Sequence, residues 1–291
     1  MAKKPATAAR NKLIYCFGKS KCDGKGDMKA LLGGKGANLC EMTQIGLNVP
    51  PGFVITTDAC MEFLESGKLP SALMDEVGHN IQSLEVQTGR RFGAAANGVR
   101  INDPNASVSD GQGGVYFSDS GVFSARAPAT GRVYHVTAMG VMTEVVSGIK
   151  YANGVQFDPA TRTLYVSEHL ARRILALTLD SRQRVTATKV FADFAQIPAT
   201  KSHTYEEAGP DGLILRPGYL VVAEYGEGRV HVFTREGVWR TTLKVSMPFV
   251  DTVAFDGAGN LWAGGSFQNT RPPFEGAVVR FPQSEWEQPA R

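Results

Sequence analysis

The sequence predicts a mainly β protein that is preceded by a small α/β segment. Two observations support this fold class. Residues 1–93 place apolar side chains at helical spacing around one glycine-rich stretch, whereas residues 94–291 contain short strands that recur at a roughly constant interval. The chain has 291 residues, of which 43% are hydrophobic, and this is enough for one large domain or two modest ones. We therefore expect two parts, 1–93 and 94–291.

The first part is expected to alternate short strands and helices. Apolar runs bounded by turn residues predict the strands, and apolar side chains at helical spacing predict the helices. In chain order these elements are a strand, a helix, a strand and two helices, over residues 13–17, 37–45, 53–57, 58–64 and 73–84.

A glycine-rich loop, Gly33-Gly34-Lys35-Gly36, precedes the first of these helices. Glycines allow a ligand to approach the backbone closely, N–H groups at the start of a helix point towards an anion, and Lys35 adds positive charge. Neither Ser nor Thr follows the lysine, so the loop is not of the Walker type. The residues alone leave a phosphate-binding loop and a tight structural turn as open interpretations.

The longer string around this loop, Met28–Thr43, closely resembles the start of the pyruvate phosphate dikinase family, as do residues 49–53, 56–60 and 88–93. The resemblance covers almost all of residues 11–93. It implies the opening of an ATP-grasp domain in which Lys35 contacts the phosphates of ATP bound with Mg²⁺. The arginine segment, acidic metal ligands, phosphohistidine domain and pyruvate-binding barrel of that family do not follow Gly93. Phosphoryl transfer requires in-line positioning and metal-assisted charge neutralisation, so we expect no dikinase activity.

In the second part, a strand with aromatic or branched residues recurs four times. The middle residues of these strands are 116, 165, 221 and 262, so the spacings are 49, 56 and 41. A further strand follows each of them, over residues 131–136, 173–177, 228–233 and 276–281. A period of about 40–50 residues with several short strands per unit is typical of β-propeller blades, whereas a β-sandwich lacks this longer period. The sequence therefore predicts four blades.

Each unit also carries a polar residue upstream of its aromatic strand. The distances are 14, 12, 10 and 11 residues, and the residues are Asn102, Asn153, Asp211 and Asp251. In equivalent blades these side chains would lie at matching heights near the central axis and bring oxygen donors together, which hard cations prefer. The residues alone also allow a simpler interpretation, in which the Asn and Asp residues form turns beside Gly154 and Gly212.

Five short motifs in the second part resemble, in order, the gluconolactonase, regucalcin and luciferin-regenerating-enzyme (SMP-30-like) family of six-bladed propellers; they lie at residues 100–103, 116–121, 152–155, 164–168 and 209–212. The resemblance spans about residues 97–281. It implies that Asn153 and Asp211 bind a divalent cation (calcium, magnesium, manganese or zinc), and that Asp211 is also the catalytic acid/base. It further implies that Arg100 and Asn102 contact a small lactone or ester substrate.

The sequence departs from that family in one respect. The third metal ligand of the family, a glutamate in a Gly-Glu-Gly-Pro motif of the first blade, has no counterpart here. Four blades are predicted where the family has six. We therefore expect a partial propeller, about four of six blades, and a lactonase activity that is impaired by the missing first blades.

Composition and charge narrow the possible partners and location of the protein. The net charge is +3, and residues 1–93 account for all of it without interleaved aromatic residues, so no nucleic-acid partner is expected. The four cysteines lie in the first part without a C-x-x-C pair, which favours free thiols in a reducing compartment. No apolar run reaches the ~18 residues of a membrane span and no secretory signal is present, so we expect no membrane partner and a cytoplasmic location.

Three functional hypotheses follow. The first is a metal-dependent hydrolase of the lactonase type. The second is a nucleotide- or metal-binding module without turnover, in which Lys35 contacts the anion. The third is a fusion of two partial proteins, a chimera without a function of its own.

Overall fold

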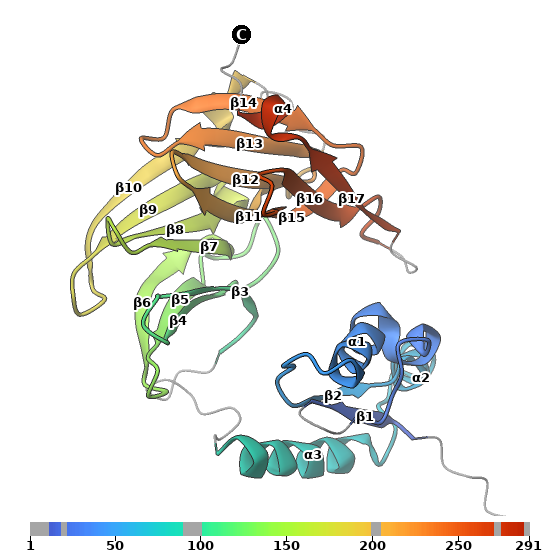
Figure 1. The fold of residues 1–291 in the computed structure, drawn as a ribbon. Helices are drawn as coiled ribbons and strands as arrows, with labels where there is room; N and C mark the ends of the chain where they lie inside the picture. The colour runs from blue at the N-terminus through green and yellow to red at the C-terminus, as the bar shows by residue number, and fades with distance from the viewer. Residues whose placement is uncertain (1–11, 19–21, 90–100, 199–204, 271–274, 288–291) are drawn as a thin grey trace, which may run out of the picture. The chain divides into compact units, whose positions relative to one another are not determined.

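The computed structural model describes residues 12–18, 22–89, 101–198, 205–270 and 275–287. The chain divides into two compact units, Met1–Ala94 and Ala95–Arg291 (Figure 1). Each unit has its own hydrophobic core, and each is described separately.

The first unit is the small α/β segment, with two strands and three helices among its described residues: β1 (Ile14–Phe17), α1 (Lys29–Gln44), β2 (Gly52–Ile55), α2 (Thr57–Ser66) and α3 (Leu73–Thr88). β1 and β2 pair antiparallel, with Ile14 opposite Ile55. Ile14 packs with Ala59 of α2 and Leu73 of α3, which holds these helices on the strand pair.

The glycine-rich stretch does not form the open loop that we expected. α1 runs through it, and the backbone leaves the helical region inside α1 at Gly33, with φ 68° and ψ 165°. Glycine adopts this left-handed φ without a steric penalty, so two helical pieces join there at a kink. The helical structure begins at Lys29, earlier than predicted, because the Leu32 N–H donates to the Met28 carbonyl at 2.9 Å.

Among its described residues, the second unit contains four groups of antiparallel strands, which we call blades one to four; the sequence predicts this number. Blade one consists of β3 (Pro104–Ser109), β4 (Val115–Asp119), β5 (Gly131–Val136) and β6 (Met142–Ile149). Blade two consists of β7 (Ala152–Asp158), β8 (Thr163–Glu168), β9 (Arg173–Leu179) and β10 (Val185–Asp193). Blade three consists of β11 (Gly209–Arg216), β12 (Tyr219–Tyr225), β13 (Arg229–Thr234) and β14 (Trp239–Lys244).

Blade four, within the described residues, consists of β15 (Phe249–Phe255), β16 (Leu261–Ser266) and β17 (Gly276–Phe281), and the short helix α4 (Gln283–Trp286) follows. Two single-turn 3-10 helices follow strands of blade two, η1 (His169–Ala171) and η2 (Phe194–Gln196). A pairing of Tyr225 with Phe249 joins blades three and four into one hydrogen-bonded sheet. The described strands therefore confirm a mainly β fold.

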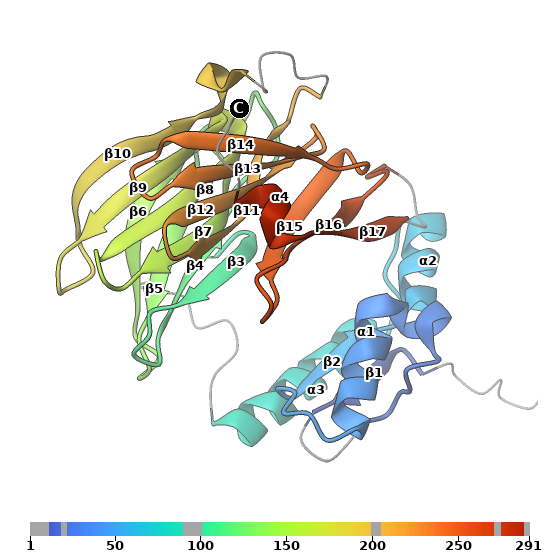
Figure 2. The same cartoon turned by 45° about the horizontal axis from the view of Figure 1, so that its top comes forward.

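The first strands of successive blades lie next to one another. β3 packs against β7, β7 against β11, and β11 against β15, so these four strands form the inner edge of the unit. The blades follow one another around this edge as an open arc (Figures 1 and 2). This arrangement confirms the partial propeller, and it brings residues that are about 50 positions apart in sequence to one place.

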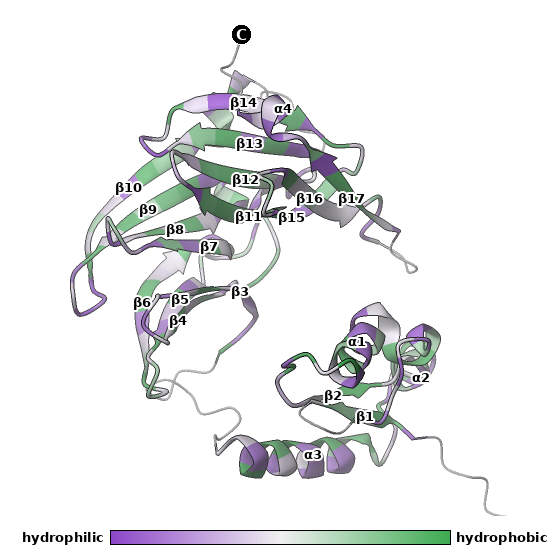
Figure 3. Ribbon diagram, viewed as in Figure 1, coloured by the Kyte–Doolittle hydropathy of each residue, from purple (hydrophilic) through white to green (hydrophobic). Residues whose placement is uncertain are grey.

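The core fills the space between adjacent blades. Tyr116 and Leu164 belong to the cluster between blades one and two, Ile174 and Phe233 to the cluster between blades two and three, and Val230 and Leu261 to the cluster between blades three and four. Figure 3 shows strong apolar character along β12 and β13. The middle strands β8 and β12 are buried along nearly their whole length, because side chains of neighbouring blades cover both of their faces.

Two further expectations concern membranes and thiols. The helices in the described part of the chain are each too short or too polar to cross a membrane. The described cysteines Cys16, Cys22, Cys40 and Cys60 form no disulfide bond, and the Cys16 Sγ donates a hydrogen bond to the Asn80 Oδ1 at 3.0 Å.

Candidate functional site

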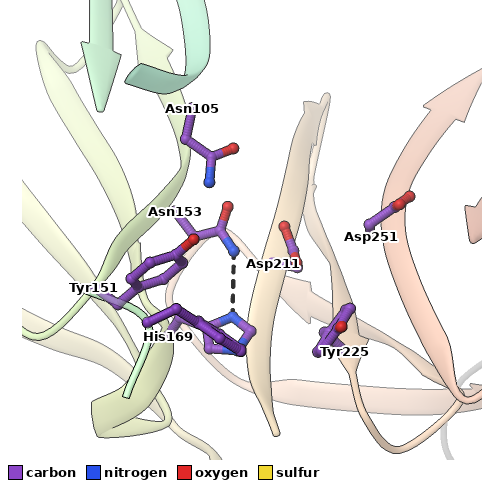
Figure 4. Close-up of a pocket in the computed structure, with 8 residues that line it drawn as sticks. Asn105, Tyr151, Asn153, His169, Asp211, Tyr225 and Asp251 are labelled. Atoms are coloured by element: carbon purple, nitrogen blue, oxygen red, sulfur yellow. Dashed lines mark hydrogen bonds between the residues drawn. The ribbon is translucent and has the colours of Figure 1, made fainter. Parts of the chain in front are cut away.

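A pocket of about 330 Å³ lies where the inner strands of the four blades meet. Figure 4 shows the side chains that point into it. They fall into a polar group from the inner strands and a group of rings from the adjoining loops and strands: Asn105, Asn153, Asp211 and Asp251, with Phe123, Tyr151, His169 and Tyr225.

Each of the four blades contributes one polar side chain to this pocket from its inner strand. Asn153, Asp211 and Asp251 were expected in this ring from their spacing, and all three line the pocket. In blade one the corresponding residue is Asn105 in β3, which corrects the ring position that the spacing gave to Asn102. Asn102 precedes β3 and is exposed, and its backbone N–H donates to the Asp119 carboxylate at 2.9 Å.

The sequence itself contains evidence that Asn105, rather than Asn102, is the equivalent residue of blade one. It precedes the middle of its aromatic strand by 11 residues, which matches the 12, 10 and 11 of the other blades better than 14 does. It also precedes Asp110 by five residues, as Asn153 precedes Asp158 and Asp251 precedes Asp256. Each of these aspartates accepts backbone N–H groups in the turn that follows the inner strand, so the turn fixes the register of the blade.

Two glycines bring the polar side chains of neighbouring blades together. A Cβ on Gly154 would lie 2.2 Å from the Asp211 carbonyl oxygen, and one on Gly212 would lie 2.5 Å from the Asp251 carbonyl oxygen. Both glycines lie inside strands, β7 and β11. The alternative that Asn153 and Asp211 form turns beside them is therefore wrong: the glycines permit close backbone approach between blades.

His169 holds the amide of Asn153. The Asn153 Nδ2 lies 3.3 Å from His169 Nδ1, while His169 Nε2 lies 2.8 Å from the Glu207 carbonyl oxygen. Burial lowers the pKa of His169 to about 4, so the ring is neutral near pH 7. The Nδ1 atom also lies 3.0 Å from the Pro210 carbonyl oxygen, so which ring nitrogen donates is set by the tautomer of the histidine. The ring and the Asn153 amide nitrogen lie side by side in the pocket (Figure 4).

Asp211 is a carboxylate in an unusual environment. Burial raises its pKa well above the usual range, and the negative charge of Asp251 raises it further. Hydrogen bonds from the Asn153 side chain and the Gly212 N–H act in the opposite direction. No lysine or arginine belongs to the described lining of the pocket, so two carboxylates face one space without a neutralising side chain.

This donor set suits a hard divalent cation. Two carboxylates and two amides, converging without a basic neighbour, are the oxygen ligands that such ions take. Within the described ranges, no group of three or more His, Cys, Asp or Glu side chains could hold a metal, so the amide oxygens would be needed to complete a site. Both ring nitrogens of His169 face protein groups, which makes this histidine a support of Asn153 rather than a ligand.

Two predicted site residues lie elsewhere. Arg100 lies outside the described residues. Lys35 lies in the first unit, exposed on α1 and two positions after the kink at Gly33. His169 and the aromatic residues of the pocket were not predicted from the sequence. The position of His169, immediately after β8, was the one signal that could have placed it at the same end of the blade.

Comparison with known proteins gives two kinds of match. A family described as "SMP-30/Gluconolactonase/LRE-like region" matches residues 41–279. Over 90 residues the chain is 52% identical to the pyruvate, phosphate dikinase of Entamoeba histolytica, which covers 31% of this chain and 10% of that protein. Over 154 residues it is 36% identical to the chloroplastic pyruvate, phosphate dikinase of Flaveria trinervia, which covers 53% of this chain and 14% of that protein.

The solved structure of a luciferin-regenerating enzyme is similar in fold. It has a TM-score of 0.50 and 24% sequence identity, and the match covers 62% of this chain and 60% of that chain. The chain thus spans about a seventh of the Flaveria dikinase and less than two thirds of this structure. Because the family match extends over more than half of the sequence, from residue 41 to residue 279, the chain belongs to the SMP-30/gluconolactonase/LRE-like family.

Proposed function

We propose that this protein hydrolyses a lactone or a related ester, and that a divalent cation held by Asn153 and Asp211 supports the reaction. The observation that carries the proposal is the convergence of Asn153, Asp211 and Asp251, from three different blades, on one pocket. Membership of the SMP-30/gluconolactonase/LRE-like family supports a lactonase-type reaction.

The cation would polarise the carbonyl group of the substrate and increase the acidity of water. Asn153 and Asp211 would hold it, with the Oδ1 of Asn153 presented by the contact between its amide nitrogen and His169. Asp251 and Asn105 line the same pocket and would add oxygen atoms on its other sides. The Asp251 carboxylate would supply the negative charge that, in the family, comes from the glutamate of the first blade.

The side chains divide the chemical step among them. The Asp211 carboxylate accepts a proton from water as the water oxygen forms a bond to the carbonyl carbon. The bond from that carbon to the ring oxygen then breaks, and the same proton passes from Asp211 to the departing oxygen, which gives a hydroxy acid. Arg100 would orient the substrate oxygens, as the family resemblance implies, and Asn105, which lines the pocket where Asn102 does not, would take the second contact. The raised pKa of Asp211, which lines the pocket beside Asp251, suits a carboxylate that takes and returns a proton.

The test is hydrolysis of a δ-lactone at constant pH with added Ca²⁺, Mg²⁺, Mn²⁺ or Zn²⁺. Asp211→Asn and Asn153→Ala should each lower kcat/KM by at least about 100-fold, since each removes a group that acts directly at the reacting centre. Glu236→Gln, at an exposed position in the turn between β13 and β14, serves as the matched control. Activity that survives both pocket substitutions, or that ignores chelation of the cation, would contradict the proposal.

A second candidate function concerns the first unit alone. The 52% identity to a pyruvate, phosphate dikinase over 90 residues, together with an exposed Lys35 after the kink at Gly33, supports binding of a nucleotide phosphate without turnover. Calorimetry with ATP and Mg²⁺ would measure it. Lys35→Ala should abolish the signal and Lys29→Ala, an exposed lysine at the start of the same helix, should not. An isotherm that is unchanged in Lys35→Ala would rule this function out.

A further inference from the structure

One side of the pocket is a continuous group of four rings, which we call the aromatic wall: Phe123, Tyr151, His169 and Tyr225. Phe123 lies 4.9 Å from Tyr151, 5.5 Å from His169 and 6.3 Å from Tyr225, measured between ring centroids. His169 lies 5.7 Å from both tyrosine rings. Every ring therefore touches at least two others, and the four act as one surface.

The polar atoms of the aromatic wall are already engaged by the protein. The Tyr225 hydroxyl accepts a hydrogen bond from the Asn269 side chain at 2.7 Å. Both nitrogens of His169 face backbone carbonyl oxygens or the Asn153 amide, at 2.8–3.3 Å. Phe123 has no polar atom. The Tyr151 hydroxyl is a further polar atom of the wall, and it forms side-chain hydrogen bonds with Ser120 and Asn105. Because its hydroxyl groups have protein partners, the wall presents mainly ring faces and carbon atoms to the pocket.

Two features indicate that this surface is built for a ligand. Phe123 lies in a loop, and 38% of its surface is exposed although it is large and apolar. Tyr151 has a left-handed backbone, with φ 63°, which is costly for a residue with a Cβ and is typical of functional sites. Tyr151 immediately precedes β7, and its ring points into the pocket (Figure 4). The ring lies beside that of Phe123, with the centroids 4.9 Å apart.

We infer that the aromatic wall selects substrates that carry an aryl or alkyl group on the lactone ring, in preference to polyhydroxylated sugar lactones. The oxygen donors of the inner strands face the ester group, and the rings cover the apolar part of the substrate. Burial of an apolar group against Phe123 removes carbon surface from water on both partners. A hydroxyl group in the same place would lose its water without gaining a partner. This inference rests on the proposed hydrolase function.

Three δ-lactones that share one ring test the inference: δ-valerolactone, its benzo-fused form dihydrocoumarin, and glucono-1,5-lactone. In Phe123→Ala, kcat/KM for dihydrocoumarin should fall about tenfold, while that for δ-valerolactone should change less than twofold. Comparing each substrate with itself across variants cancels the different reactivities of the leaving groups. Val122→Ala, which removes the exposed neighbour of Phe123 and is not part of the pocket lining, is the matched control.

A binding measurement separates this inference from the proposed function. Chroman is the cyclic ether that matches dihydrocoumarin without a carbonyl group, and tetrahydropyran matches δ-valerolactone in the same way. Saturation-transfer NMR in the presence of a chelator should detect chroman binding that is lost in Phe123→Ala and kept in Val122→Ala. Weak or absent binding of tetrahydropyran is expected.

The outcomes are distinct. Chroman binding that depends on Phe123, without hydrolysis of any lactone, would support the aromatic wall and overturn the hydrolase. Equal losses for dihydrocoumarin and δ-valerolactone in Phe123→Ala, or a preference for glucono-1,5-lactone in the wild-type protein, would overturn the wall as a selectivity element and leave the hydrolase intact. Chroman binding that is unchanged in Phe123→Ala would overturn it as well.

Discussion

Replacement of Gly154 by alanine tests whether the close approach of blades two and three positions the site. Gly154 lies next to Asn153 in β7, and an added Cβ would lie 2.2 Å from the backbone oxygen of Asp211 and 2.7 Å from a methyl group of Leu213. The oxygen belongs to the backbone of β11, so it cannot swing aside as a side chain would. The φ of Gly154 is not in the left-handed region, so the substitution adds steric contact without backbone strain.

The magnitude follows from this contact. Ordinary Cβ contacts begin at 3.4 Å, so β7 and β11 must separate by about 1.2 Å to accommodate the methyl group. Overpacking of this kind costs about 1–3 kcal/mol, and the lower entropy of the unfolded alanine variant offsets about 0.4–1 kcal/mol. We therefore expect a net loss of about 1–2 kcal/mol, or a fall of about 2–8 °C in Tm for a unit of this size.

The same displacement moves Asn153 away from Asp211. A misplacement of about 1 Å at a reacting centre can cost about 100-fold in rate, so lactone hydrolysis should fall by more than the stability loss explains. Calorimetric unfolding and steady-state kinetics at 25 °C, well below the Tm, separate the two effects. Gly257→Ala is the control, because a Cβ at Gly257 has no atom within 4 Å. If Gly154→Ala is as stable and as active as Gly257→Ala, the reasoning that the glycine sets the distance between the blades is refuted.

Three further predictions concern buried groups. Glu224 is fully buried, and its carboxylate accepts hydrogen bonds from Arg172 and His231, each at 2.9 Å. Glu224→Ala should therefore lower the free energy of unfolding in urea by about 3–5 kcal/mol. A loss below about 1 kcal/mol would show that water replaces the carboxylate as the partner of Arg172 and His231. Burial lowers the pKa of His169 from 6.5 to about 4. Between these pH values the histidine is protonated in the unfolded chain but neutral in the native protein, so the free energy of unfolding should fall by up to about 3 kcal/mol as the pH drops from 6.5 to 4. This slope should flatten in His169→Gln, and an identical slope in both proteins would assign it to other groups. Trp286 is 1% exposed and closes the core of blade four, so Trp286→Ala should cost about 3–5 kcal/mol by thermal unfolding, and a wild-type Tm would contradict that role.

The sequence was sufficient for the fold because the blade repeat depends on local signals. The strands around residues 116, 165, 221 and 262 are short runs of aromatic and branched residues, and turn residues separate them, so their type and order could be predicted. The period then placed Asn153, Asp211 and Asp251 on equivalent strands, and equivalent strands of a propeller meet at its centre. Pattern and spacing alone also allowed turns at these positions, and the family resemblance favoured the ring for Asn153 and Asp211.

The other parts of the site depend on contacts between segments that are distant in sequence. Tyr151 enters the pocket because of its left-handed backbone, and no residue preference predicts this conformation for tyrosine. Phe123 reaches the same pocket from a loop, where strand periodicity gives no information. His169 is recognisable as a supporting residue only when the carbonyl oxygens of Glu207 and Pro210, about 40 positions later, are brought to its ring.

In the second unit, the glycines that allow neighbouring blades to pack closely lie next to the polar residues of the candidate site. In blades two and three, a glycine directly follows the polar residue of the inner strand. A Cβ on Gly154 would meet the backbone of Asp211, and one on Gly212 would meet the backbone of Asp251. Each carboxylate is therefore positioned by the blade that precedes it, and the distance between donors is fixed by backbone packing rather than by flexible side chains. In blade four the residue after Asp251 is Thr252, which is exposed, so the described residues provide no equivalent contact there. Tuning of the site through packing should consequently act at Gly154 and Gly212, whereas changes at Thr252 should leave the positions of Asn153 and Asp211 unchanged.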